Sequence, residues 1–116
     1  MEKKIVFFAF TGHKTCFVHV LLNGLDMQRR GYLVKIVIEG AATRLIREFA
    51  EPDKPFASLF AKVREAGLIA GVCRACAKTM KSLPDVEAQG LPLLDDMSGH
   101  PAMEPYIEQG YQVITL

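Results

Sequence analysis

Residues 3–10 contain an unbroken run of six apolar side chains, Ile5–Phe10, nearly all β-branched or aromatic. Because the run does not alternate between apolar and polar residues, it predicts a strand that is covered on both faces. Strands of this kind are typical of parallel sheets, which need a helical crossover between successive strands. This segment therefore restricts the chain to an α/β fold.

The rest of the sequence alternates between further apolar runs and segments with helical spacing, such as Phe17, Val20 and Leu21 before Gly31. We expect strands at residues 32–38, 68–72 and 111–116, a weaker strand within 86–94, and helices within 16–31, 41–50, 55–67, 75–83 and 98–110. Alternating strands and helices indicate right-handed βαβ units. The prediction is a single domain, residues 1–116, folded as a three-layer α/β/α sandwich around a five-stranded, mainly parallel sheet, flavodoxin-like in general appearance.

The composition limits the binding partners and the cellular compartment that we expect for the protein. Fourteen basic and 13 acidic residues leave a formal charge of +1. This charge is not the large positive excess that favours binding to nucleic acid or to a membrane surface. The first apolar run is too short for a signal peptide, and no stretch approaches the roughly 20 residues that span a bilayer, so we expect a cytoplasmic protein. Three cysteines, an odd number, then favour a reactive or metal-binding role over a disulfide framework.

The residues that carry chemistry gather at one predicted edge of the sheet. In an open parallel sheet, ligands bind beyond the carboxyl ends of the strands. The loops at this edge are residues 11–16, 39–43, 73–76 and 95–100. They contain all three cysteines and two of the three histidines.

Cys73 is the strongest single candidate, because a strand ends and a helix begins at this residue. The amides and positive dipole end of that helix, with Arg74 and two further lysines, Lys78 and Lys81, should lower the pKa of the thiol and favour a nucleophilic thiolate. The alternative is that Cys73 is a small, inert, buried side chain.

Cys76 lies about one helical turn after Cys73 and could resolve an oxidised or persulfidated sulfur as a disulfide, or simply face the core. Thioredoxin-like exchange fits poorly, because the Cys-x-x-Cys pair follows the third strand. A zinc site needs two more ligands, which Cys16 and His19 could supply. The remaining alternative is sulfur carriage on an exposed thiolate in cationic surroundings.

Four further residues lie at the same edge. The segment 11–15 resembles the end of a phosphate-binding P-loop but lacks its upstream glycine, so it predicts at most a small-anion site at Gly12 and Lys14. Glu39 and His100 could assist proton transfer, or be ordinary solvated side chains.

The chain resembles the DsrE/DsrF-like sulfur-relay proteins over essentially its whole length. The resemblance is carried by the first strand, by residues 26–31 and 34–40, and above all by Gly71-Val-Cys73-Arg-Ala-Cys76-Ala-Lys. It implies that Cys73 carries a persulfide, that the sheet is parallel and five-stranded, and that the protein forms homo-oligomers, commonly trimers or hexamers. Cys16 is not a general position of that family, and its role stays open.

The sequence thus predicts a sulfur-carrier or sulfurtransferase-like protein that acts with donor and acceptor proteins and needs no cofactor. Cys73 is the expected nucleophile, Arg74 its stabilising cation and Cys76 the second thiol, with Cys16, Glu39 and His100 as auxiliary residues. The alternatives are a zinc-binding module that uses Cys16, His19, Cys73 and Cys76, and a non-catalytic oligomeric module.

Overall fold

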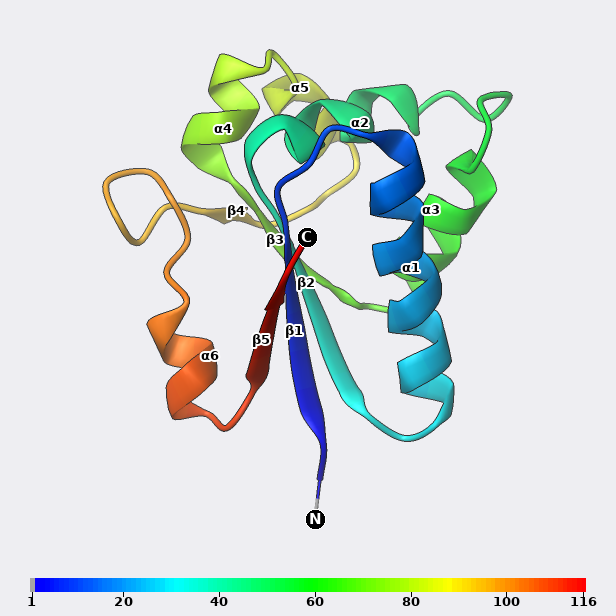
Figure 1. The fold of residues 1–116 in the computed structure, drawn as a ribbon. Coiled ribbons are helices and arrows are strands. Elements are labelled where there is room, and N and C mark those ends of the chain that lie inside the picture. Colours follow the sequence, from blue (N-terminus) through cyan, green and yellow to red (C-terminus); the bar gives the residue numbers. More distant parts are fainter. Residues whose placement is uncertain (1) are drawn as a thin grey trace.

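The computed structural model describes residues 2–116 and contains one five-stranded sheet with helices on both faces (Figure 1). The strands are β1 (Lys4–Ala9), β2 (Leu33–Ile38), β3 (Ile69–Cys73), β4 (Leu93–Leu94) and β5 (Gln112–Thr115). The helices are α1 (Lys14–Arg29), the 3-10 turn η1 (Gly40–Ala42), α2 (Thr43–Glu48), α3 (Ala57–Glu65), α4 (Arg74–Thr79), α5 (Leu83–Ala88) and α6 (Glu104–Glu108). The predicted α/β sandwich is confirmed.

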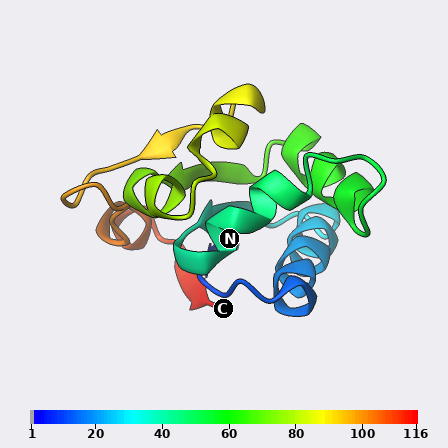
Figure 2. The same ribbon diagram turned by 90° about the horizontal axis from the view of Figure 1, so that it is seen from above.

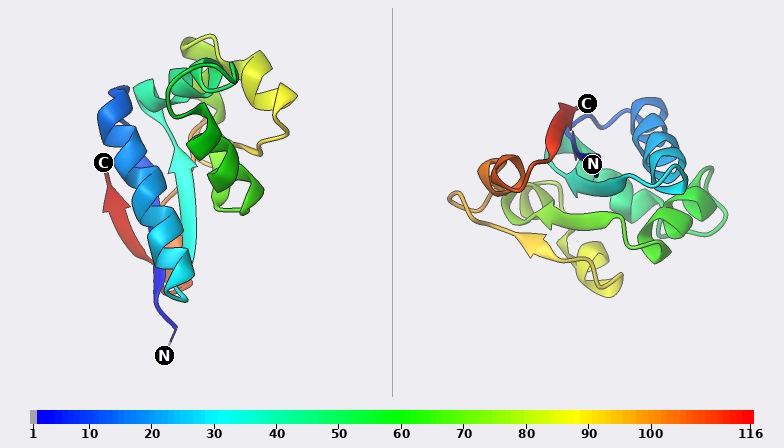
Figure 3. Two further views of the ribbon diagram at one scale, coloured as in Figure 1. Left: turned by 90° about the vertical axis from the view of Figure 1, so that its right-hand side faces the viewer. Right: turned by 90° about the horizontal axis from the view of Figure 1, so that it is seen from below.

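The order of the strands explains which helices cover which face. All neighbouring strands are parallel, in the order β4-β3-β2-β1-β5. The chain moves in one direction from β1 to β4, and right-handed crossovers then place α1 to α5 on one face of the sheet. The connection from β4 to β5 runs back across the sheet, so α6 lies on the opposite face. Figure 3 shows α1 and α3 side by side on the first face, and Figure 2 shows α6 on the other side of the sheet from α1.

The two faces of the sheet have separate apolar clusters. On the first face Phe17, Phe49 and Phe60 come from three helical segments and pack with ring centroids 5.5–6.2 Å apart. On the second face Phe8, which is fully buried, meets Tyr106 of α6 edge-on at 5.7 Å. The first strand is therefore covered on both faces, as its unbroken apolar run predicts.

The weak strand predicted within residues 86–94 is wrong over most of its length. Residues 83–88 form α5, with Pro84 in its first turn, where a missing N–H costs nothing. Val86 is fully buried and belongs to the core cluster of the first face. Only Leu93 and Leu94 pair with β3. The apolar residue that suggested a strand is thus a core residue of a short helix.

A second difference concerns the start of α3. The spacing of Phe56 and Phe60 predicts that both contribute to one apolar helix face, but the helix begins at Ala57. Phe56 has a φ of 68° and a side chain that is 46% exposed, whereas Phe60 is fully buried. The helix therefore begins after a left-handed residue that turns the phenyl ring away from the core.

Gly71 allows β4 to pack closely against the residues that precede Cys73. A Cβ atom at this position would lie 2.5 Å from Cγ of Leu94, and Leu94 is the register partner of Cys73. Only a residue without a side chain lets the short edge strand approach β3 this closely.

We expect Gly71→Ala to lower the free energy of unfolding by about 1–3 kcal/mol, because the added methyl overpacks the contact with Leu94. Chemical denaturation measures the change. In a Leu94→Ala background the same substitution should cost less than about 1 kcal/mol, since the opposing atoms are gone. Equal costs in the two backgrounds would contradict the steric explanation.

Candidate functional site

The predicted chemistry-bearing edge of the sheet contains a point where two neighbouring strands send the chain to opposite faces. The chain leaves β3 toward α4 on the first face, and it leaves β4 toward α6 on the second (Figure 1). Ligand sites of open parallel sheets lie beyond the carboxyl ends of the strands, at divergences of this kind. Cys73 ends β3, and His100 lies in the segment after β4. The topology therefore brings these two residues to the same edge of the sheet.

Cys73, Cys76 and His100 form a compact cluster there. The Cys73 sulfur lies 3.1 Å from Nδ1 of His100, and the Cys76 sulfur lies 3.8 Å from the same nitrogen. The ligand atoms of all three residues lie within 4.8 Å of one another. The sequence places these residues at one edge, and the structure adds that their side chains meet.

The start of α4 and the segment after β4 hold this cluster in place. Cys73 is the N-cap of α4, and its sulfur accepts a hydrogen bond from the backbone amide of Cys76 at 3.4 Å. The amide of Ala75 donates to the carbonyl of Gly99 at 2.9 Å, and Met97 and His100 exchange two backbone hydrogen bonds. Gly99 has a φ of +94°, a conformation that favours glycine. The sequence does not predict that the Gly99 carbonyl takes part in the site; the glycine itself is the one sign of an unusual backbone there.

The environment of Cys73 differs from the exposed thiolate that the sequence predicts. Its side chain has no exposed surface, and burial raises the pKa of the thiol from an ordinary 9.0 to about 12. The Cys76 amide lowers this pKa, but the neighbouring Cys76 thiol and the charge of Glu39 raise it further. The predicted lowering of the Cys73 pKa is therefore wrong for the site as the structure shows it. There Cys73 is a neutral thiol next to the side chain of His100.

Arg74 also differs from its predicted role. Its side chain is half exposed and forms an ion pair with Asp95, Nε to Oδ2, at 3.0 Å. The guanidinium is thus directed to a carboxylate of the segment after β4 rather than to the Cys73 sulfur. Arg74 thus links the start of α4 to the segment after β4. The Cys73 sulfur has the Cys76 amide as its hydrogen-bond donor instead.

Glu39 directly follows β2, near this cluster, and its side chain is only 7% exposed. Burial raises the pKa of the Glu39 carboxyl from 4.5 to about 7. Its charge contributes to the raised pKa of Cys73, which places the two groups in electrostatic contact. Glu39 is thus a buried carboxyl that gains or loses a proton near neutral pH, as proton transfer requires.

Cys16 and His19 lie outside the cluster. Both are exposed on α1. Among residues 2–116, the group of close metal-ligating atoms contains Cys73, Cys76 and His100 but neither of these two. The predicted zinc site is therefore wrong for Cys16 and His19. These two residues lie on α1, which covers β1 and β2, whereas Cys73 and Cys76 lie where β3 leads into α4.

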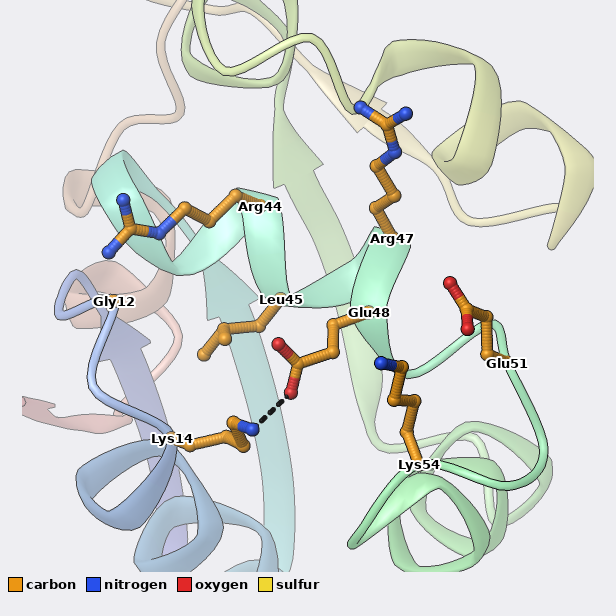
Figure 4. Close-up of a pocket in the computed structure, with 8 residues that line it drawn as sticks. All are labelled: Gly12, Lys14, Arg44, Leu45, Arg47, Glu48, Glu51 and Lys54. Atoms are coloured by element: carbon orange, nitrogen blue, oxygen red, sulfur yellow. Dashed lines mark ion pairs between the residues drawn. The ribbon is translucent and has the colours of Figure 1, made fainter.

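Gly12 and Lys14 line a separate cavity of about 480 Å³ (Figure 4). The Lys14 ammonium forms a 2.6 Å ion pair with Glu48 in this cavity, so its charge is already neutralised. A Cβ on Gly12 would lie 2.7 Å from the Arg44 guanidinium, which occupies the space beside the loop. The two residues of the predicted anion site thus line one cavity, but Lys14 is already paired with the carboxylate of Glu48.

Comparison with known proteins supports the fold and the family. The solved structure of a conserved protein of unknown function from Bacteroides thetaiotaomicron, BT1422, matches with a TM-score of 0.73, covering 98% of this chain and 95% of that one at 17% identity. At that identity the likeness shows the fold alone. The chain is also 30% identical over 99 residues to the uncharacterized protein MJ0733 of Methanocaldococcus jannaschii, covering 85% of the chain and 78% of that protein. The chain belongs to the same family as this archaeal protein.

A second relative matches a smaller part of the chain. An uncharacterized protein of Archaeoglobus fulgidus is 37% identical over 51 residues, which make up 44% of this chain and 84% of that protein. No protein-family model matches the chain. Within residues 2–116, no helix is both long and apolar enough to cross a membrane.

The raised pKa of Glu39 predicts a pH-dependent stability. Because the folded-state pKa lies above the unfolded value, the contribution of the neutral carboxyl is complete below about pH 4.5 and is lost as the pH rises through about 7. Relative to Glu39→Gln, the wild-type free energy of unfolding should fall by about 1–3 kcal/mol between roughly pH 5 and pH 8. Denaturation curves at the two pH values test this, and parallel changes in both proteins would show that Glu39 is not responsible.

Proposed function

We propose that the protein carries sulfane sulfur as a persulfide on Cys73, accepting it from a donor protein and passing it to an acceptor protein. The observation that supports this best is the Cys73 sulfur at the start of α4, with His100 Nδ1 at 3.1 Å and the Cys76 thiol one turn away. A nucleophilic sulfur, a proton acceptor and a second thiol are the groups that sulfur transfer uses.

Loading begins with transfer of the Cys73 proton to His100, which gives a thiolate paired with an imidazolium. The thiolate attacks the outer sulfur of a donor persulfide, and the donor's S–S bond breaks. The departing donor thiolate takes the proton from His100. The net reaction converts the Cys73 thiol and a donor persulfide into a Cys73 persulfide and a donor thiol, with no change in the total number of electrons.

Discharge has two routes. An acceptor thiolate attacks the outer sulfur and restores the Cys73 thiol. Alternatively, Cys76 attacks the inner sulfur, which forms a Cys73–Cys76 disulfide and releases hydrosulfide. The second route consumes the pair, and an external dithiol must then supply two electrons to regenerate it.

Burial of Cys73 imposes a condition on loading. The carbonyl of Gly99 and the ring of His100 contact the Cys73 sulfur from the segment after β4. A donor therefore reaches this sulfur only when the Gly99 carbonyl moves off it while the His100 ring stays within hydrogen-bond reach. Water that enters then lowers the cost of the thiolate charge. Cys76 is half-buried, so it is the more accessible thiol of the pair.

The resemblance of residues 71–78 to DsrE/DsrF-like proteins supports the same assignment. Under this proposal the protein works in the cytoplasm, as its short apolar runs predict, and assembles as a homo-oligomer, as the resemblance implies. These features rest on the sequence.

Incubation of the full chain with a sulfane-sulfur donor, in the presence of a chelator, should add about 32 Da to Cys73 because its thiolate takes up one sulfur. Mass spectrometry of the peptide that contains residues 73–76 locates the adduct. Cys76→Ser should lengthen the lifetime of the adduct, because the intramolecular attack is removed. His100→Gln should slow loading by about 100-fold, the usual contribution of a positioned proton acceptor.

Cys16→Ser is the matched control, because Cys16 is an exposed cysteine outside the cluster. This variant should load sulfur like the wild type. Absence of an adduct on Cys73, under conditions that load a known persulfide carrier, would rule out the proposed function.

A further inference from the structure

We propose that Cys73, Cys76 and His100 also bind a Zn²⁺-class divalent cation as three ligands of a tetrahedral site. The two cysteine sulfurs and Nδ1 of His100 lie within 4.8 Å of one another. Thiolate sulfur and imidazole nitrogen are the ligands that zinc prefers in proteins. The set differs from the sequence-based one in that His100, from the segment after β4, replaces Cys16 and His19.

The separations of the ligand atoms fit this coordination. In a tetrahedron with Zn–S near 2.3 Å and Zn–N near 2.0–2.1 Å, a sulfur and a nitrogen lie about 3.5–3.6 Å apart. The structure has 3.1 Å from Cys73 and 3.8 Å from Cys76 to the shared nitrogen. Both sulfur–nitrogen distances are within about half an ångström of this value, and the two sulfurs, which lie within 4.8 Å of each other, must come to about 3.8 Å. Binding therefore requires shifts of up to about 1 Å, within reach of side-chain rotation.

The backbone around the cluster suits a pair of metal-bound thiolates. The Cys76 amide already points at the Cys73 sulfur from 3.4 Å, in the first turn of α4. His100 is held by its two backbone hydrogen bonds with Met97, and Gly99 is tied to Ala75. Hydrogen bonds thus already hold the three ligand positions near one another before a cation arrives, which reduces the ordering that binding requires.

The charges also balance. Two thiols each release a proton to the solvent on binding, and two thiolates with a neutral imidazole neutralise a divalent cation. Within residues 2–116, no further Cys, His, Asp or Glu belongs to the group. The fourth position is therefore left for water or a small ligand, which is the arrangement of open rather than closed zinc sites.

This site goes beyond persulfide carriage, although it uses the same sulfur atoms. A cation bound by Cys73 occupies the electron pair that attacks a sulfur donor, so metal loading and sulfur loading exclude each other. Zinc binding itself requires no sulfur chemistry, and the two proposals can fail independently.

Titration of metal-free, reduced full-length protein with Co²⁺ tests the site directly. We expect one equivalent to bind, with the intense thiolate-to-cobalt absorption and the visible bands of tetrahedral coordination, and Zn²⁺ should displace it. Cys76→Ser and His100→Gln should each weaken Zn²⁺ binding by more than about 100-fold, beyond what the loss of an outer-shell contact gives. Cys16→Ser and His19→Gln should bind like the wild type.

A second measurement needs no variant in the cluster. In the wild-type protein, one equivalent of Zn²⁺ should protect Cys73 and Cys76 from alkylation and leave Cys16 reactive. The inference is overturned if Co²⁺ gives no tetrahedral thiolate spectrum, if Cys76→Ser and His100→Gln bind zinc unchanged, or if zinc protects Cys16 instead. Zinc binding without a sulfur adduct in the chelator-treated assay removes only the persulfide function.

Discussion

The constraint that organises this protein is the burial of a parallel sheet on both faces. Val6 and Phe8 point to one side of β1 and Phe7 to the other, and all three are buried. Each face thus needs a cover, and right-handed crossovers provide one only if the chain reverses its direction across the sheet. The reversal comes after β4, so the chain leaves β3 and β4 toward opposite faces. The place where the cysteines meet His100 thus follows from the way the core is covered.

The sequence predicts the fold well because its strongest signals are local. The runs that become β1, β2, β3 and β5 are apolar on both faces or bounded by glycines, and the structure has strands at each of them. Where one signal has two interpretations the prediction fails. Val86 fits a strand or the buried side of a short helix, and burial against the first face decides for the helix. Phe56 has helical spacing with Phe60, yet a left-handed backbone excludes it from α3.

The sequence predicts where the site lies in the fold, but not the pKa values and ion pairs of its residues. Strand ends are visible in the sequence, so Cys73, Glu39 and His100 are expected at one edge. The pKa of Cys73 depends on how deeply the thiol is buried, and that depends on residues 99 and 100, more than twenty positions away in the chain. The same distance hides the Arg74–Asp95 ion pair. Helix dipoles and basic neighbours can be counted from sequence, whereas desolvation requires coordinates.

The segment that covers Cys73 contributes little to either apolar cluster. Met97 is 54% exposed, and the neighbouring Asp95 and Asp96 are exposed as well. The contacts that hold the segment against α4 are the Arg74–Asp95 pair, one backbone hydrogen bond from Ala75 to Gly99, and the contacts of Gly99 and His100 with the cysteine sulfurs. Opening it leaves the packing on both sides of the sheet intact, so the free energy of this local opening is a small fraction of that of global unfolding. The deepest thiol in the chain is therefore covered by a segment that adds almost no apolar packing of its own.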